Sequence, residues 1–93
     1  MALKFGQIVV SKQNEHPVAQ INSDEAVVIT SKKYPKSGDK TIPIEKSDVT
    51  GGFKIHRNGS FLSKMVVANN SGRIIGQFTK NGQKKLSNFV KKL

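Results

Sequence analysis

The stretch FKIHRNGSFLSKMVVANNSGRIIGQF, residues 53–78, decides the fold class that this sequence predicts. Runs of apolar and β-branched residues alternate in it with turn formers, which is the pattern of β-strands joined by tight turns. Asn58-Gly59 suits a type I′ turn, because both central residues of that turn take positive φ. We therefore expect residues 53–57 and 60–68 to pair across this turn as a β-hairpin.

The strand pattern continues on both sides of the hairpin. After a second break at residues 69–72, residues 73–78 are expected to add a third strand and complete a meander. Residues 41–44 belong at a sheet edge, because Pro43 cannot donate a ladder hydrogen bond. The other predicted strands, all upstream, are residues 4–11, 17–22 and 25–31.

The chain closes with an amphipathic helix, for which Thr79 or Asn81 is the expected N-cap. Its apolar residues recur at i, i+3, i+4 and i+7, which is one stripe of a 3.6-residue period. Because such a short helix is marginal alone in water, the stripe must be buried against the sheet or a partner's helix. The predicted fold class is therefore α+β, a curved antiparallel β-sheet with one C-terminal amphipathic helix. The stripe consists of Leu86, Phe89, Val90 and Leu93.

Charge is unevenly distributed along the 93 residues, which fit a single domain. The chain has 16 Lys and Arg against 6 Asp and Glu, a net charge of +10. All six acids lie in residues 1–48, whereas residues 49–93 carry nine bases and no acid. One sign of charge over so long a segment indicates a polyanion partner, because bases that neutralise phosphates release condensed counterions. The alternatives are a basic protein without such a partner and an inhibitor of an acidic protein.

The predicted hairpin places an aromatic ring among cations on one face of the sheet. Because side chains alternate between the faces of a strand, Lys54, His56 and Phe61 fall on the face opposite the core. Bases stack on such a ring at about 1–3 kcal/mol each, while cations follow the phosphates. The alternative is that a bulge or a register shift places Phe61 in the core. The candidate contacts in this half of the chain are Lys54, His56, Arg57, Phe61, Lys64 and Arg73.

A second candidate site is the loop that follows the third predicted strand. It combines cations with the only tyrosine of the chain, and Pro35 keeps the preceding residue extended. Such a loop could clamp phosphates and stack one base, or it could be a solvated loop. The candidate residues are Lys32, Lys33, Tyr34 and Lys36.

No motif in the sequence predicts an enzyme. The chain has no cysteine, no metal-ligand spacing and no phosphate-cradling glycine motif. His16 and His56 are far apart along the chain, so an acid–base ribonuclease built from them and Glu15 needs a tertiary contact that the sequence does not indicate. We therefore expect a non-enzymatic protein with no metal and no cofactor.

The chain resembles the positive cofactor four family of single-stranded-DNA-binding transcriptional coactivators. Residues 53–78 and the ending KKLSNFVKKL, residues 84–93, are similar to the strands, the Gly-containing hairpin and the closing helix of that family. A second placement matches AVVITSKKYPKSGDKTIPIE, residues 26–45, to a family strand and its basic loop. The resemblance implies a curved four-stranded sheet and a dimer formed through the helix. It implies DNA contacts at Lys54, Arg57, Phe61, Lys64 and Arg73, and dimer contacts at Leu86, Phe89, Val90 and Leu93.

Together these features predict a homodimeric, non-enzymatic protein that binds single-stranded DNA and acts in transcription regulation, replication or recombination. An RNA-binding module and a small inhibitor of a nucleic-acid enzyme remain the alternatives, since DNA and RNA share the phosphate and stacking interactions. No run approaches the ~20 apolar residues of a membrane span, and the N-terminus lacks a signal peptide pattern. We expect no membrane partner and a cytoplasmic or nucleoid-associated protein, nuclear in a eukaryote.

Overall fold

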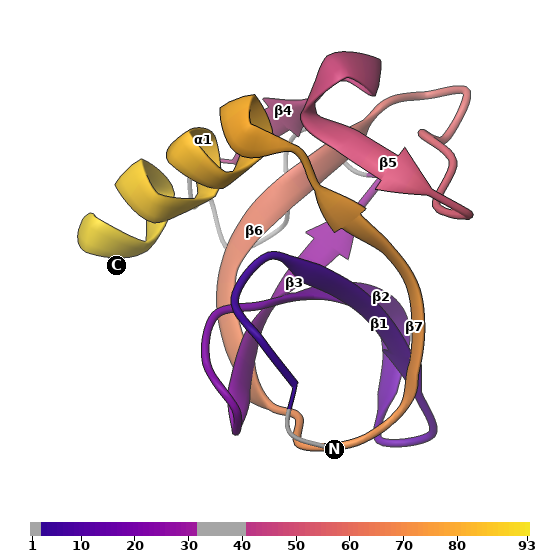
Figure 1. Ribbon diagram of the computed structural model, residues 1–93, viewed down its shortest axis with the longest axis vertical. Helices are drawn as coiled ribbons and strands as arrows, with labels where there is room; N and C mark the ends of the chain where they lie inside the picture. Colours follow the sequence, from indigo (N-terminus) through magenta and orange to yellow (C-terminus); the bar gives the residue numbers. More distant parts are fainter. Residues whose placement is uncertain (1–2, 32–40) are drawn as a thin grey trace.

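The computed structural model describes residues 3–31 and 41–93, and it confirms the predicted fold class. An antiparallel seven-stranded sheet curls round on itself, and one C-terminal helix lies across its upper end (Figure 1). The strand order is β4-β6-β3-β2-β1-β7-β5. In chain order the elements are β1 (Gln7–Ser11), β2 (Asn14–Gln20), β3 (Glu25–Thr30), β4 (Ile42–Ile44), the 3-10 turn η1 (Lys46–Asp48), β5 (Val49–Gly51), β6 (Ser60–Ala68), β7 (Arg73–Phe78) and α1 (Lys80–Lys91).

The sheet buries apolar side chains on both faces, because consecutive residues of β1, β2 and β3 alternate between two clusters. Ile8 belongs to the cluster beneath α1, whereas its neighbour Val9 belongs to a smaller cluster with Leu3 on the other face. The edge position of β4, which contains Pro43, is as predicted. No helix in the described ranges is long and apolar enough to cross a membrane.

The predicted hairpin and meander are wrong. β6 pairs with β3 and β4, and β7 pairs with β1 and β5, so β6 and β7 are not neighbours. The turn comes one residue early, closed by the Gly59 N–H, which donates to the His56 carbonyl at 2.8 Å. Gly59 has φ +96°, whereas Asn58 does not take positive φ. Phe53 and Ile55 pack against the core cluster, and the first residues of β6 already have a strand on each side.

The prediction that Phe61 lies on a solvent-exposed face is also wrong. Phe61 stands between its register partners Thr30 of β3 and Pro43 of β4, and its side chain is only 9% exposed. Its ring also lies close to Gly59, where a Cβ atom would approach the ring Cζ to 2.9 Å. Phe61 therefore offers no open aromatic surface for stacking.

The helix begins where the sequence predicts, and Leu86 and Phe89 of its apolar stripe are buried within the same chain, whereas Leu93 is 47% exposed. The Thr79 hydroxyl caps the helix by accepting from the Gly82 N–H at 3.2 Å. Leu86 and Phe89 are 0% and 6% exposed and belong to the main core cluster, against which Val90 also packs. The prediction that these side chains form a dimer contact is wrong for Leu86 and Phe89, because the sheet already covers them.

The first turn of α1 is fixed to η1 through Asp48, a buried carboxylate. Its Oδ2 atom accepts from Lys85 Nζ at 2.5 Å and from the Glu45 N–H at 2.9 Å. Its carbonyl accepts from the Thr79 N–H at 2.9 Å. Burial raises the pKa of Asp48, but the hydrogen bonds from Lys85 and Glu45 and the charge of Lys85 outweigh burial and lower that pKa below 3.8, its ordinary value.

This lowered pKa predicts a stability contribution that disappears in acid. The ionised form is favoured in the folded state, so the contribution is complete above the ordinary value of 3.8 and is lost as the pH falls through the folded pKa. In urea unfolding at pH 7, Asp48→Asn is expected to cost about 1–3 kcal/mol, because two hydrogen bonds to a charged group are weakened. The difference between the two proteins should shrink as the pH falls below 3.8 and through the folded pKa. Asp24→Asn, at an exposed turn, is the control, and an Asp48→Asn deficit that grows as the pH falls below 3.8 would contradict the account.

Candidate nucleic-acid interface

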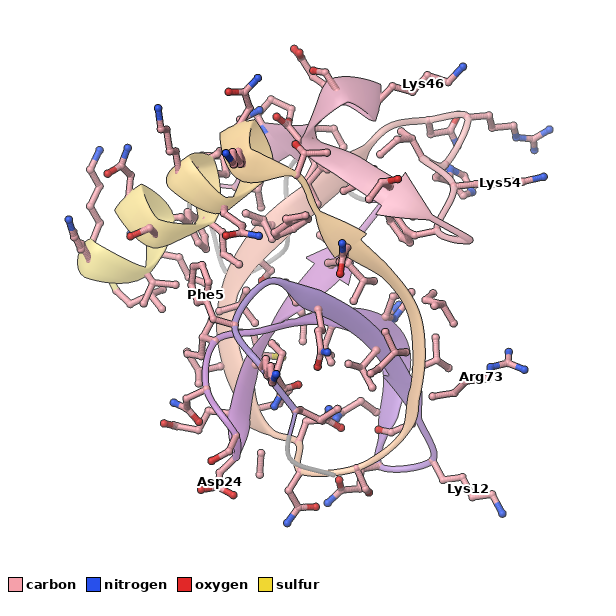
Figure 2. The ribbon with its side chains drawn as sticks, in the orientation of Figure 1. Phe5, Lys12, Asp24, Lys46, Lys54 and Arg73 are labelled. Carbon is pink, nitrogen blue, oxygen red and sulfur yellow. The ribbon has the colours of Figure 1, made fainter. Side chains whose placement is uncertain are left out.

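Four exposed cations follow one side of the molecule, while other exposed cations, such as Lys84 and Lys91, lie on α1. Figure 2 shows Lys46, Lys54, Arg73 and Lys12 along this side, while Asp24 projects from the opposite lower corner. We call the surface with these four cations the basic side. Among the described residues the only ion pair is Lys85–Asp48, beneath α1. None of the four cations of the basic side therefore forms an ion pair with a described carboxylate.

Four hollows follow one another along the basic side. The first, the Arg73 hollow, lies between the β1–β2 turn and the start of β7. The second lies along β5 and β7 and shares Thr50 and Gly51 with the third. The third shares Phe53 and Lys54 with the fourth, which we call the His pocket. Among the side chains that the structure describes, no Asp or Glu lines any of the four hollows.

The His pocket, a hollow of about 220 Å³, brings together both histidines of the chain. The start of β2 supplies His16, and the turn before β6 supplies His56. Hydroxyl side chains from the end of β3 and the start of β6 complete a polar lining around an apolar base that includes Phe53. Its polar residues are His16, Thr30, Ser31, Lys54, His56 and Ser60.

Hydrogen bonds to the residues that follow it hold the ring and the backbone of His56. The Asn58 N–H donates to His56 Nδ1 at 3.0 Å, and the His56 N–H donates to Ser60 Oγ at 3.0 Å. Since Nδ1 accepts, Nε2 carries the proton of the neutral ring. The pocket therefore holds one imidazole as a hydrogen-bond donor beside the Lys54 ammonium.

The antiparallel register of β2 with β3 explains why His16 reaches this pocket. Val18 pairs with Val28 and Gln20 with Ala26, so the start of β2 lies beside the end of β3. The two histidines are far apart along the chain, and the prediction from sequence did not include this proximity. The sequence does contain a signal for this proximity. If the predicted strands 17–22 and 25–31 pair across the Ser23-Asp24 turn, the start of the first strand lies beside the end of the second.

The structure separates the predicted contacts into groups. Lys54 and His56 share the His pocket, and Arg73 lines the hollow at the other end of the series. Arg57 and Lys64 are exposed but line none of the four hollows. The loop candidates lie outside the described residues, namely Lys32, Lys33, Tyr34 and Lys36.

A buried amide network holds the β6–β7 connection beside the Arg73 hollow. Asn69 is fully buried, and its Nδ2 donates to Gln20 Oε1 at 2.9 Å. Its Oδ1 accepts from Ser11 Oγ at 2.8 Å, and Ser11 lines the hollow. The network therefore fixes the two chain segments that form this end of the basic side.

Comparisons of the chain with protein-family models, curated proteins and solved structures found no match. The resemblance to the positive cofactor four family stays a prediction, and the described sheet has seven strands where that family has four. Within the described ranges no group of three or more His, Asp or Glu side chains is placed to hold a metal ion.

Proposed function

We propose that the protein binds single-stranded nucleic acid along its basic side. The observation that carries this proposal is the series of four hollows, whose described lining contains four cations and both histidines and no carboxylate. A polyphosphate backbone lying along it would exchange condensed counterions for Lys and Arg. Asp24, on the far side, would not oppose such a strand.

The apolar surface within the hollows favours a single strand over a duplex. Phe53, half-buried at the junction of the third hollow and the His pocket, takes the place of Phe61 as the aromatic side chain of the site. Pro17 extends this apolar surface within the His pocket. Unpaired bases can stack on such surfaces, whereas the bases of a duplex are already stacked on one another. We propose that the protein binds the single strands that are exposed during transcription, replication or recombination.

Fluorescence anisotropy with single-stranded DNA, RNA and duplex DNA of equal length tests this proposal. Single strands should bind more tightly than duplex, with log affinity falling linearly as log salt rises. Lys54→Ala should weaken binding about tenfold at low salt and reduce the salt slope by about 0.7, the value for one phosphate contact on a single strand. Lys84→Ala, the same charge change on an exposed helix position, should change affinity less than about twofold. Equal weak binding of all three ligands that vanishes near physiological salt would overturn the proposal.

The His pocket favours a second candidate function, cleavage of a bound RNA strand. His16 can accept the proton of a ribose 2′-hydroxyl, whose oxygen then attacks the adjacent phosphorus. The bond from phosphorus to the 5′ oxygen breaks, and water protonates the leaving oxygen. His56 Nε2–H and the Lys54 ammonium can donate to the phosphate oxygens, on which charge develops. This candidate rests on both histidines lining one pocket, and its products are a 2′,3′-cyclic phosphate and a 5′-hydroxyl.

A further inference from the structure

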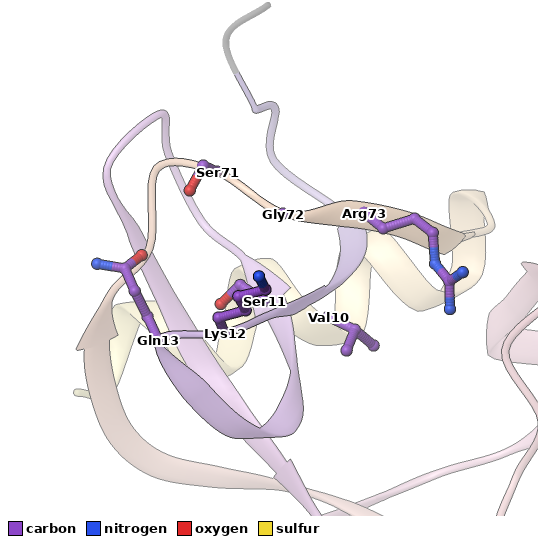
Figure 3. A pocket seen from close by; sticks show the side chains of 7 residues that line it. All are labelled: Val10, Ser11, Lys12, Gln13, Ser71, Gly72 and Arg73. Atoms are coloured by element: carbon purple, nitrogen blue, oxygen red, sulfur yellow. The ribbon is translucent and has the colours of Figure 1, made fainter.

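The Arg73 hollow is the largest of the four described hollows, at about 550 Å³, and it lies at the opposite end of the series from the His pocket. Figure 3 shows Gln13 at one end of it and Arg73 at the other, with Ser11 and Lys12 between them. Lys12 and Arg73 are exposed, and no other described residue forms an ion pair with either. Two cations that form no ion pair with a described residue therefore line one concave surface.

The walls of this hollow are held rigidly from behind. Ser11 donates to the buried Asn69, as described above. Gly72 has φ +129° and approaches β1 so closely that a Cβ atom there would lie 2.7 Å from the Val10 carbonyl oxygen. A preformed surface loses little conformational entropy when a ligand binds. The two chain segments that form the hollow are therefore held in place by the fold itself.

We propose that the Arg73 hollow is a second phosphodiester-binding subsite, which holds a distant part of the same strand that occupies the His pocket. This inference rests on the proposed function and adds a length requirement to it. A strand long enough to reach both subsites gains affinity through effective concentration, whereas a shorter one occupies only one of them. Lys12 and Arg73 supply the charges, and Ser71 also lines the hollow, whereas the Ser11 hydroxyl proton is donated to Asn69.

The test is a length series of single-stranded oligonucleotides from 2 to 16 nucleotides, titrated against the wild type and two double variants. The wild type should show a steep rise in affinity at one length. Lys12→Ala/Arg73→Ala should remove this rise, weaken binding of the longest oligonucleotide at least about tenfold, and reduce the salt slope by about 1.4, the value for two phosphate contacts. The shortest oligonucleotides that bind should bind this variant within about twofold of the wild type, because the His pocket is untouched. Lys84→Ala/Lys91→Ala, with the same charge change on α1, should keep the rise.

The outcomes separate this inference from the proposed function. If Lys12→Ala/Arg73→Ala and the α1 double variant bind every length alike, while Lys54→Ala weakens binding, the second subsite is wrong and the proposed function stands. If the wild type binds no oligonucleotide near physiological salt, both are wrong. Competition with inorganic phosphate and a mononucleotide distinguishes the source of the phosphate. A mononucleotide that binds at the hollow as tightly as the longest strand would make it a small-anion site and would overturn the proposal.

Discussion

Replacing Gly82 by alanine is expected to destabilise the protein by about 3 kcal/mol, although alanine is the better helix former by about 1 kcal/mol. Gly82 lies in the first turn of α1, directly against the backbone of Asp48. A Cβ atom at Gly82 would overlap the Asp48 carbonyl oxygen and lie 2.8 Å from its carbonyl carbon. Because backbone atoms cannot move aside as a flexible side chain can, α1 would have to shift away from η1. That shift would weaken the Lys85–Asp48 ion pair and the packing of Leu86.

Guanidinium unfolding and thermal melts measure this effect. For a domain of this size, about 3 kcal/mol corresponds to a fall in Tm of about 12–24 °C. Asn81→Ala, at the exposed neighbouring position, is the matched control, and it should be neutral or slightly stabilising because it gains helix propensity without a contact. A Gly82→Ala protein as stable as the Asn81→Ala protein would mean that α1 does not pack on η1 as described.

Loss of RNA cleavage in His16→Ala is the second large expected effect. If the His pocket cleaves RNA, removing the general base should lower the cleavage rate about 10²–10⁴-fold. His56→Ala removes a donor to the developing charge and should cost about 10²–10³-fold. A DNA strand of the same sequence should bind and remain intact, because it lacks the 2′-hydroxyl that His16 would deprotonate. Strand binding by His16→Ala should remain within a few-fold of the wild type, because the cations of the basic side are unchanged.

Gel analysis of a labelled RNA, with the product ends identified by mass, makes this measurement. A 2′,3′-cyclic phosphate in the wild-type reaction that is absent with His16→Ala supports the second candidate function. Equal cleavage by wild type, His16→Ala and His56→Ala would show that the activity does not arise in this pocket. No cleavage by the wild type would leave strand binding as the function of the site.

The local parts of the fold could be predicted from the sequence, whereas the strand pairing could not. The helix stripe and the Thr79 cap depend on residues within one or two turns, and both appear as expected. The hairpin at Asn58-Gly59 failed because its turn signal is local, while the partners of β6 are set by burial elsewhere. Phe53 and Ile55 pack against the core cluster, and no strand formed by residues 53–57 pairs with β6.

Part of the candidate site could likewise be predicted from the sequence, and part of it depends on tertiary structure. Lys54, His56 and Arg73 were found because the second half of the chain is uniformly basic. Lys12 was missed because it belongs to the first half, where acids balance the bases along the sequence. In the fold the acid Asp24 lies on the other side of the molecule from Lys12, so these two charges are separated in space. The contact between the ends of β2 and β3 that completes the His pocket depends on a register that no single segment specifies.

The central claim, that a single strand lies along the basic side, is tested most directly by mapping backbone amide shifts during titration with a single-stranded 12-mer. We expect the largest changes at Lys12, Lys54, His56 and Arg73, with α1 positions such as Lys84 almost unchanged. Changes confined to the exposed face of α1, or small changes spread evenly over all exposed lysines, would contradict the account.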